Sequence, residues 1–196
     1  MLSLDILEGQ RGEWKLKVEP EQPRTRKWVR EVRDWLLSLT IAVVAALLIQ
    51  NYAFAQTEVR NVSMQHTLFE GQRLIEDKLS YHFDQPNRGD IVIISGPESD
   101  KRLVKRVIGL PGDMLDIKDG HVLINGTVLE EPYVKGLTFS NGLSIPYTVP
   151  DKKVFVMGDN RENSQDSREL GPISISSLEG RAVFRLWPLN KFGLLN

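Results

Sequence analysis

K-R-L-V-K-R-V-I-G-L-P-G-D, residues 101–113, is the clearest strand signal in this chain of 196 residues. The run 102–108 is rich in apolar residues, and the sequence G-L-P-G ends it. Side chains alternate across a strand, so one face carries Leu103, Lys105 and Val107 and the other carries Val104, Arg106 and Ile108. Each face places one cation between two apolar residues. The pattern therefore predicts a strand but leaves open which cation faces the core.

The sequence on both sides of this strand also favours β-structure. Further short apolar-rich runs lie at 73–78, 90–95, 153–157 and 181–186. Between 114 and 130 there are two tight-turn signals, Asp119-Gly120 and Asn125-Gly126. The second is flanked by β-forming residues, which is a strong hairpin signal. We predict a mostly β, antiparallel domain with a hairpin-containing insertion at about 113–153.

Three segments are predicted to lie outside the strands. Residues 137–150 are expected to form a loop, and a short helix is expected to end at Leu178-Glu179. The stretch 158–168, G-D-N-R-E-N-S-Q-D-S-R, contains no apolar residue, so its composition predicts a solvated surface loop. Asp166 and Arg168 can pair within it, although an exposed ion pair contributes only about 0 to 1 kcal/mol.

The N-terminal part contains an uncharged run. No charged residue occurs at positions 35–57, a span of 23 residues. A helix that crosses a bilayer needs about 20 mostly apolar residues. Trp35 lies at one end of the run and Tyr52 and Phe54 lie at the other, as interfacial anchors do. The run therefore predicts a single transmembrane helix at 35–55.

The charges before this run predict its orientation. Five basic residues lie just before it at positions 24–33, namely Arg24, Arg26, Lys27, Arg30 and Arg33. By the positive-inside rule, segment 1–34 is cytoplasmic, and the domain 56–196 lies outside the plasma (cytoplasmic) membrane. A second interpretation is a cleavable secretory signal, because Ala53-Phe54-Ala55 has the small-x-small pattern of a cleavage site. The long preceding region favours the anchor.

Composition excludes several kinds of function. The formal net charge is −1, so no overall field favours nucleic acid, and no nucleic-acid partner is predicted. The chain has no cysteine and only three histidines, none in an H-E-x-x-H pair, so no metal site is predicted. No glycine-rich phosphate-binding motif is present, and no cofactor is expected.

Ser63, in E-V-R-N-V-S-M-Q-H-T-L, is a candidate nucleophile if a base lies within hydrogen-bonding reach. His66 stands where a lysine would have completed an S-x-x-K motif. The other candidate base is Lys105, because an amine can lose its proton, whereas the guanidinium of Arg106 effectively never does. Neutrality near pH 8 requires the lysine pKa to fall by about 2 to 3 units, and burial among apolar neighbours lowers it. Ser164 is a candidate to orient such an amine by hydrogen bonding.

Five motifs follow one another along the chain. They are S-M-x-x-T-L from Ser63, R-G-D-I-V from Arg88, K-R-V-I-G-L-P-G-D from Lys105, G-D-N-R-x-N-S-x-D-S-R from Gly158 and G-R-A-V-F-R-L-W-P-L-N from Gly180. In their order and in their residues they resemble the motifs of the type I signal peptidases, which are membrane-bound serine proteases with a Ser-Lys dyad. The resemblance covers about residues 35–196, and the third and fifth motifs are long enough to be specific.

The resemblance implies a signal-peptidase-like catalytic domain and a role for each matching residue. Ser63 is then the nucleophile and Lys105 the general base. Ser164 would hold the lysine amine, and Asp166 with Arg168 would brace the loop. No cofactor is implied.

The resemblance also implies how substrate and oxyanion are bound. The oxyanion donors would be the Ser63 backbone N–H and Asn61, which stands where several family members have serine. The substrate pockets would be lined by Val59, Arg60, Leu103 and Val104. Narrow apolar pockets select small side chains, the A-x-A rule of secretory signals. Three further positions depart from the usual pattern: His66 replaces proline, Val62 replaces a small residue, and Arg60 replaces proline or another neutral residue.

We therefore hypothesise a membrane-anchored serine endopeptidase that removes N-terminal signal peptides from exported preproteins. Its expected partners are signal peptides emerging from the secretion translocon and membrane lipid. Two alternatives remain. One is a related Ser-Lys protease with another target, such as its own Ala55-Gln56 bond. The other is a non-catalytic anchored β-domain that binds exported chains.

Overall fold

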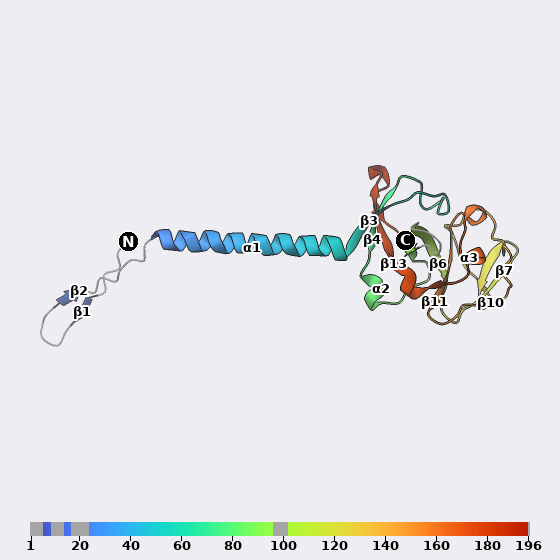
Figure 1. Cartoon of the computed structure of the whole chain (residues 1–196), viewed down its shortest axis with the longest axis horizontal. Helices are drawn as coiled ribbons and strands as arrows, with labels where there is room; N and C mark the ends of the chain where they lie inside the picture. Colours follow the sequence, from blue (N-terminus) through green and yellow to red (C-terminus); the bar gives the residue numbers. More distant parts are fainter. Residues whose placement is uncertain (1–5, 9–13, 17–23, 96–101, 196) are drawn as a thin grey trace. The chain divides into compact units, whose positions relative to one another are not determined.

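The structure is a computed structural model, and it describes residues 6–8, 14–16, 24–95 and 102–195 (Figure 1). The predicted cytoplasmic segment 1–34 therefore lies partly outside the described residues. Contacts divide the chain into two units, 1–47 and 48–196, which we describe separately.

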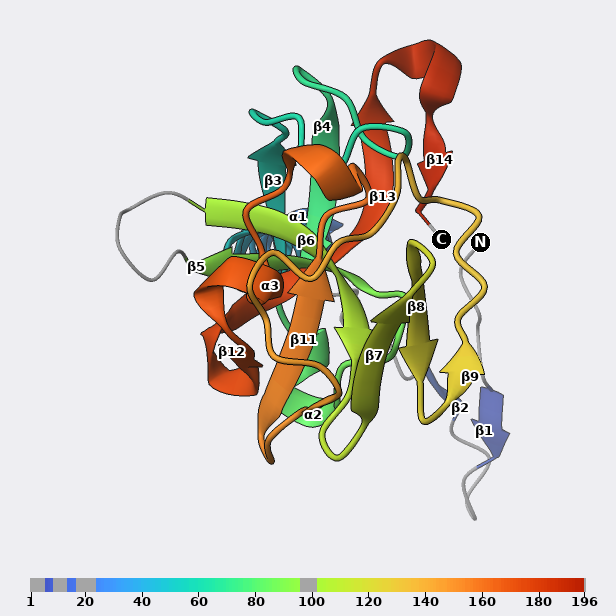
Figure 2. The same ribbon diagram turned by 90° about the vertical axis from the view of Figure 1, so that its right-hand side faces the viewer.

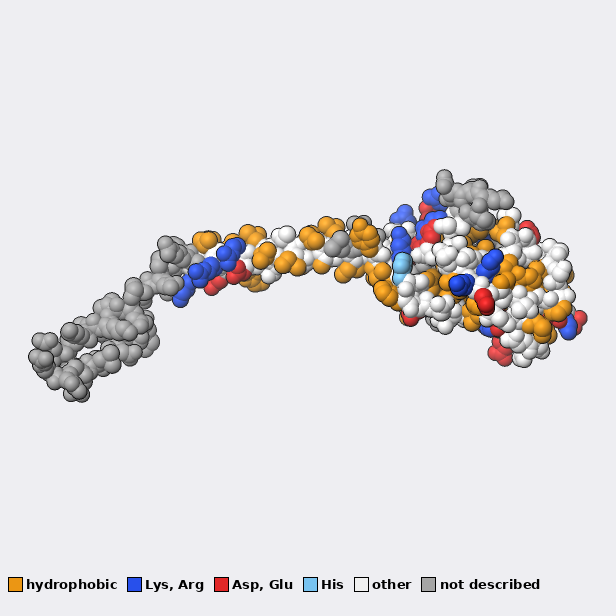
Figure 3. All heavy atoms as spheres, turned by 60° about the horizontal axis from the view of Figure 1, so that its bottom comes forward, with side chains coloured by type: hydrophobic (Ala, Val, Ile, Leu, Met, Phe, Trp, Pro, Cys, Tyr) orange, Lys and Arg blue, Asp and Glu red, His pale blue; other side chains and the backbone are white. Residues whose placement is uncertain are grey.

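The first unit contains a short antiparallel strand pair and most of a long helix. Strand β1 (Ile6–Glu8) pairs with β2 (Trp14–Leu16), and helix α1 (Arg24–Tyr52) has 29 residues. Charged side chains lie on the early turns of α1, and apolar ones cover the following turns (Figure 3). The exposed apolar side chains of these turns include Trp35, Leu36, Leu37, Leu39, Ile41, Val43, Val44, Leu47 and Ile49. Among the side chains that are described, no helix is both long enough and apolar enough to qualify as a membrane span.

The second unit is built on an eight-stranded sheet. In spatial order its strands are β12 (Ile173–Ser174), β11 (Lys153–Met157), β6 (Arg102–Gly109), β5 (Ile91–Ser95), β13 (Leu178–Trp187), β4 (Arg73–Asp77) and β3 (Phe54–Glu58), with β14 (Gly193–Leu194) on β13. Figure 2 shows β3, β4 and β13 side by side. Every pairing is antiparallel. The predicted fold class, mostly β and antiparallel, is confirmed.

A second sheet has four strands. They are β10 (Tyr147–Thr148), β7 (Met114–Lys118), β8 (His121–Ile124) and β9 (Thr127–Val128). The turns between β7, β8 and β9 are the two predicted ones. Asp119 and Gly120 have φ values of 51° and 79°, and Asn125 and Gly126 have 53° and 84°. Positive φ at both central residues is what a type I′ hairpin turn requires, so both predicted turns and the hairpin predicted at Asn125-Gly126 are confirmed.

Two predictions for segments outside the strands are wrong. The expected loop at 137–150 contains β10, because Tyr147 pairs with Leu115 of β7. The expected helix ending at Leu178-Glu179 is only a 3₁₀ turn, and β13 begins at Leu178. Leu178 is 8% exposed and pairs with Ile94, so long-range sheet pairing overrides the local helical preference.

The remaining elements are short. They are α2 (Ser80–Phe83), α3 (Ser167–Leu170), and the 3₁₀ turns η1 (Arg161–Asn163), η2 (Ile175–Ser177) and η3 (Leu189–Lys191). The strand predicted at 181–186 is part of β13, and β14 folds back onto its end.

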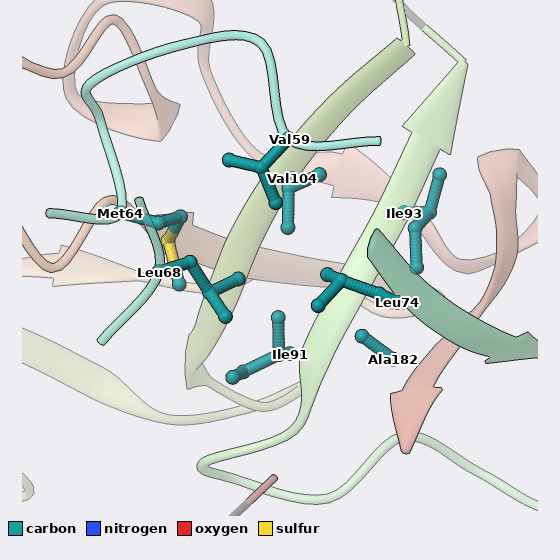
Figure 4. Close-up of a cluster of buried hydrophobic side chains, with 8 residues drawn as sticks. All are labelled: Val59, Met64, Leu68, Leu74, Ile91, Ile93, Val104 and Ala182. Atoms are coloured by element: carbon teal, nitrogen blue, oxygen red, sulfur yellow. The ribbon is translucent and has the colours of Figure 1, made fainter. Parts of the chain in front are cut away.

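A hydrophobic cluster fixes the loop between β3 and β4. Its members are Val59, Met64, Leu68, Leu74, Ile91, Ile93, Val104 and Ala182 (Figure 4). Three of them, Val59, Met64 and Leu68, belong to this loop and are almost fully buried. Burying one such side chain contributes about 1.5 to 3 kcal/mol. The loop that carries Ser63 is therefore anchored on both sides of the serine.

Candidate active site

Ser63 and Lys105 are 42 residues apart in the sequence and adjacent in space. Ser63 lies in the loop between β3 and β4, and Lys105 lies in the middle of β6. Lys105 Nζ donates a hydrogen bond of 2.8 Å to Ser63 Oγ. The two residues are 5% and 2% exposed. This is the geometry in which an amine can serve a hydroxyl as general base.

The environment of Lys105 changes its protonation. Burial lowers the pKa of its amine from 10.5 to about 8. The Asp166 carboxylate raises the pKa and the Arg168 guanidinium lowers it, both less than burial does. Among the described residues, no carboxylate forms an ion pair with this amine. A lysine with this pKa is partly neutral near pH 8 and can accept a proton.

The hydroxyl of Ser63 makes a second contact. Ser63 Oγ donates to Asn61 Oδ1 over 2.8 Å. The serine proton is therefore directed toward Asn61, while the lysine amine donates to the same oxygen. Asn61 lies two residues before the serine, at the position predicted to supply an oxyanion donor. Its side-chain amide is within hydrogen-bonding reach of Ser63 Oγ.

The backbone of the Ser63 loop is held by a residue that sequence reasoning missed. The backbone N–H of Asn160 donates to Ser63 O over 2.9 Å, and Asn160 Nδ2 donates to Val62 O over 3.0 Å. The preceding Asp159 accepts from Thr67 Oγ1, on the far side of the serine in sequence. Only the match of N-R-x-N-S to the family pattern singled out this region, without indicating such contacts.

The polar stretch 158–168 is not the solvated loop that its composition predicts. Its buried side chains are Asp159, Asn160, Arg161, Ser164, Asp166, Ser167 and Arg168. The ion pairs are Asp159 with Arg106, Arg161 with Glu131, and Asp166 with Arg168. A buried charge costs several kcal/mol unless it is paired and hydrogen-bonded. Two of the partners lie outside the stretch, so its own composition could not predict its burial.

Asp166 and Arg168 form the predicted pair, but inside the protein. Arg168 Nε and Nη2 each donate to the carboxylate over 2.9 Å. Burial alone would raise the pKa of Asp166, but the hydrogen bond and charge of Arg168, with the Gly158 N–H and Ser164, together outweigh it and keep the pKa below its usual value. Arg168 Nη2 also donates to Arg161 O, and the Gly158 N–H donates to Asp166 Oδ2, so the pair ties the two ends of the stretch together.

Ser164 lies in this site without the contact that the resemblance implies. Its Oγ is buried and makes no hydrogen bond of ordinary geometry within the described chain, to Lys105 or to any other group. It is close enough to Asp166 to help lower the pKa of that carboxyl. A Cβ at Gly158 would lie 2.3 Å from Ser164 Oγ and 2.4 Å from Ser63 O. Only glycine therefore fits at position 158, between Ser164 and the backbone of Ser63.

A groove of about 850 Å³ lies beside the serine and lysine. It is lined by Gln56, Thr57, Glu58, Arg60, Asn61, Arg73, Arg102, Leu103 and Val104. Three of the four predicted substrate-binding residues, Arg60, Leu103 and Val104, are in this lining. The fourth, Val59, is buried in the hydrophobic cluster instead.

Two strand edges border the groove. In the described chain β3 pairs with β4 alone, so its other edge is open. β11 pairs with β6 from Arg106 onward, which leaves residues 102–105 of β6 paired only with β5. Open edges offer backbone N–H and C=O groups to an extended peptide.

A buried serine and lysine in hydrogen-bonding contact, beside a groove with open strand edges, are the arrangement expected of a serine peptidase. The sequence model of one family, described as signal peptidase, peptidase S26, matches residues 32–187. The chain therefore belongs to the signal peptidase family of serine endopeptidases, as the five motifs predicted.

Two sequence relatives from Bacillus agree with this assignment. The chain is 41% identical over 167 residues to signal peptidase I T of Bacillus subtilis (strain 168), which covers 81% of this chain and 86% of that protein. It is 40% identical over 168 residues to signal peptidase I of Bacillus licheniformis, covering 81% and 90%. A crystal structure of a signal peptidase I from Enterococcus faecalis V583 is similar at 33% identity and a TM-score of 0.44, covering 50% of this chain and 97% of that one.

Proposed function

We propose that this chain removes N-terminal signal peptides from exported preproteins by acyl-enzyme catalysis, with Ser63 as nucleophile and Lys105 as general base. The observation that carries the proposal is the 2.8 Å hydrogen bond between Lys105 Nζ and Ser63 Oγ, made by an amine that is 2% exposed. With a pKa of about 8, this amine is neutral in about a tenth of the molecules at pH 7 and in about half at pH 8.

Catalysis would proceed in two halves. Neutral Lys105 accepts the hydroxyl proton as Ser63 Oγ bonds to the carbonyl carbon of the scissile peptide. The resulting ammonium returns that proton to the leaving amine, whose departure leaves an ester on Ser63. A water molecule, deprotonated by Lys105, then attacks the ester, and Ser63 recovers its proton from the ammonium as the peptide carboxylate leaves.

Asn61 has two successive roles in this scheme. In the resting site its Oδ1 accepts the Ser63 proton over 2.8 Å, so the hydroxyl must rotate toward Lys105 before attack. Once released, the Asn61 side chain can present its Nδ2 hydrogens to the oxyanion, together with the backbone N–H of Ser63. Loss of one such donor typically lowers turnover by about 10²- to 10³-fold.

The substrate would bind as an extended strand between β3 and the first half of β6. The free strand edges supply main-chain hydrogen bonds, and side-chain pockets supply specificity. Leu103 and Val104 form the apolar part of the groove lining. Because these apolar walls stand close to the dyad, we expect small residues one and three positions before the cut, as in A-x-A sites.

We also propose that residues 35–55 anchor the enzyme in the plasma membrane, with the N-terminus in the cytoplasm and the domain 56–196 outside. The support is the uncharged span of 23 residues, the helix α1 that contains most of it, and the large apolar side chains exposed around that helix. Five basic residues at positions 24–33 lie just before the span. The proposed partners are signal peptides leaving the secretion translocon and the surrounding lipid.

The position of the Ala55-Gln56 bond favours an anchor over a cleaved signal. Ala55 pairs with Glu76 and Gln56 pairs with Ile75, so the bond lies inside β3. Cleavage there would remove part of the strand that borders the proposed substrate groove. We therefore expect the intact mass of the mature protein to include residues 1–55.

The test is cleavage of a preprotein by the full chain in detergent. Ser63→Ala and Lys105→Met should each abolish cleavage, whereas Lys118→Met, the same change at an exposed lysine of β7, should leave it unchanged. The expected product ends after an A-x-A site, which mass spectrometry identifies. An active Lys105→Met enzyme would refute the assignment of the base.

A further inference from the structure

A second cavity, of about 1200 Å³, lies apart from the groove and is strongly basic. The cationic side chains that line it are Arg88, Arg106, Arg181, Arg185 and Lys191. Among the described residues, the lining includes a single carboxylate, that of Asp90. We call this cavity the basic pocket.

The carboxylates around the basic pocket do not balance its cations. The pairs are Arg88 with Asp113, Arg106 with Asp159 and Arg181 with Asp90. Arg185 and Lys191 form no ion pair in the described part of the chain. Arg185 Nη2 donates to the backbone carbonyl of Thr67 over 2.8 Å, and Lys191 Nζ lies 4.6 Å from the centre of the Phe69 ring. Two positive charges are therefore in excess.

Two guanidinium groups of the basic pocket also have unused donors. The Nε atoms of Arg181 and Arg185 are buried and have no hydrogen-bond partner within the described residues. A buried donor without a partner costs about 1 to 3 kcal/mol, and more when the group is charged. Burial lowers the pKa of Arg185, because no counter-charge offsets its desolvation. These donors are suited to an acceptor that carries negative charge.

We propose that the basic pocket binds a phosphate group, held by Arg185 and Lys191 with Arg181 beside them. Arginine presents a planar fork of donors that matches phosphate oxygens, and lysine adds a point charge. The pocket is much larger than one phosphate, and its lining includes the exposed apolar side chains Phe192 and Leu194, which are 59% and 76% exposed. The phosphate can therefore belong to a lipid headgroup or to a soluble molecule.

The site does not depend on the proposed peptidase chemistry. His66 and Thr67 also line the basic pocket, so the pocket borders the loop that carries Ser63, on the C-terminal side of the serine in sequence. Because Arg185 holds the backbone of this loop, its removal would disturb the nucleophile as well as the pocket. Lys191, whose ammonium lies over the ring of Phe69 and forms no hydrogen bond or ion pair with a described side chain, is the cleaner position for a test.

The experiment is calorimetric titration of the full chain in a non-ionic amphipol with sodium phosphate at constant ionic strength. Lys191→Gln should weaken binding about tenfold, as loss of one charge-assisted contact does. Arg185→Lys keeps the charge but loses the fork, and should also weaken binding. The matched control Lys118→Gln, at a lysine whose side chain is 65% exposed on β7, should bind as the wild type does.

A second titration identifies the source of the phosphate. If the ligand is a lipid headgroup, dihexanoylphosphatidylglycerol should bind at least tenfold more tightly than inorganic phosphate, and Lys191→Gln should weaken it in parallel. If the ligand is soluble, the two probes should bind with similar affinity. Tighter binding of the lipid probe and equal binding of the two probes each support the site. The proposal would be overturned if neither probe showed saturable binding. It would also be overturned if Lys191→Gln and Arg185→Lys both bound with unchanged affinity. Neither result bears on the dyad, because cleavage is not the readout.

Discussion

Replacement of Lys105 by methionine should inactivate the enzyme and at the same time stabilise its fold at pH 7. The amine lies 2% exposed in the sheet, and burial disfavours its charged form. Methionine has a similar length and flexibility and carries no charge. The variant therefore loses the proposed general base but also loses the free-energy cost of burying an ammonium group.

The size of the effect follows from the pKa. A fall from 10.5 in the unfolded chain to about 8 in the folded protein corresponds to roughly 3 kcal/mol. Between these two values the unfolded chain binds more protons, so the stability of the wild type rises with pH across this window. The free-energy cost of burying the charged amine is fully present below pH 8 and is lost near pH 10.5. The hydrogen bond to Ser63 offsets about 1 kcal/mol of it, which leaves a net gain of about 2 kcal/mol for the variant at pH 7.

Thermal unfolding of the full chain in detergent measures this effect. A gain of about 2 kcal/mol should raise the Tm of Lys105→Met by roughly 4 to 8 °C at pH 7. The difference should shrink to near zero by pH 10, whereas Lys118→Met should show no such dependence on pH. If Lys105→Met is less stable than the wild type by the same amount at both pH values, the amine is not desolvated and the reasoning is wrong.

Three further predictions concern the same site. The value of kcat/KM should rise about tenfold per pH unit below pH 8 and level off above it, because only neutral Lys105 acts as a base; a level profile from pH 6 to 8 contradicts this. Asn61→Ala should lower kcat about 10²-fold at nearly constant KM, and Asn61→Ser should stay within about tenfold of the wild type. An alanine variant with the wild-type kcat would exclude Asn61 as an oxyanion donor. His66 has a φ of 99°, which proline cannot adopt, so His66→Pro should lower the Tm while His66→Gly keeps or raises it. A proline variant as stable as the wild type would show that this turn differs in solution.

Local signals predicted those parts of the fold that local chemistry determines. Asn125-Gly126 predicted its hairpin because both positions need positive φ, and the structure has 53° and 84° there. The strand β6 followed from its apolar run and the G-L-P-G that ends it. The proximity of Ser63 and Lys105 was different, because only the resemblance to a family connected two segments that are 42 residues apart.

The errors come from interactions between distant parts of the chain. The stretch 158–168 is buried because Arg106 and Glu131 supply counter-charges for Asp159 and Arg161 from elsewhere in the fold. The composition of residues 158–168 alone cannot show partners that lie elsewhere in the sequence. Likewise Leu178 begins a strand because Ile94 is its neighbour in the sheet. The contact of Asn160 with the Ser63 backbone had no sequence signal beyond the family motif.

The alternation along β6 left open which of its two cations faces the core, and both of them do. Lys105 and Arg106 are 2% and 1% exposed, on opposite faces of one strand. Their partners differ. Arg106 donates two hydrogen bonds to the Asp159 carboxylate, and the next residue after Asp159, Asn160, holds the backbone carbonyl of Ser63. Lys105 forms no ion pair in the described chain and hydrogen-bonds the Ser63 hydroxyl, so burial acts on its pKa with little compensation. Adjacent positions of one strand thus supply a permanent cation, which helps to position the proposed nucleophile, and an amine that can release its proton; of the two residue types, only lysine can fill the second role.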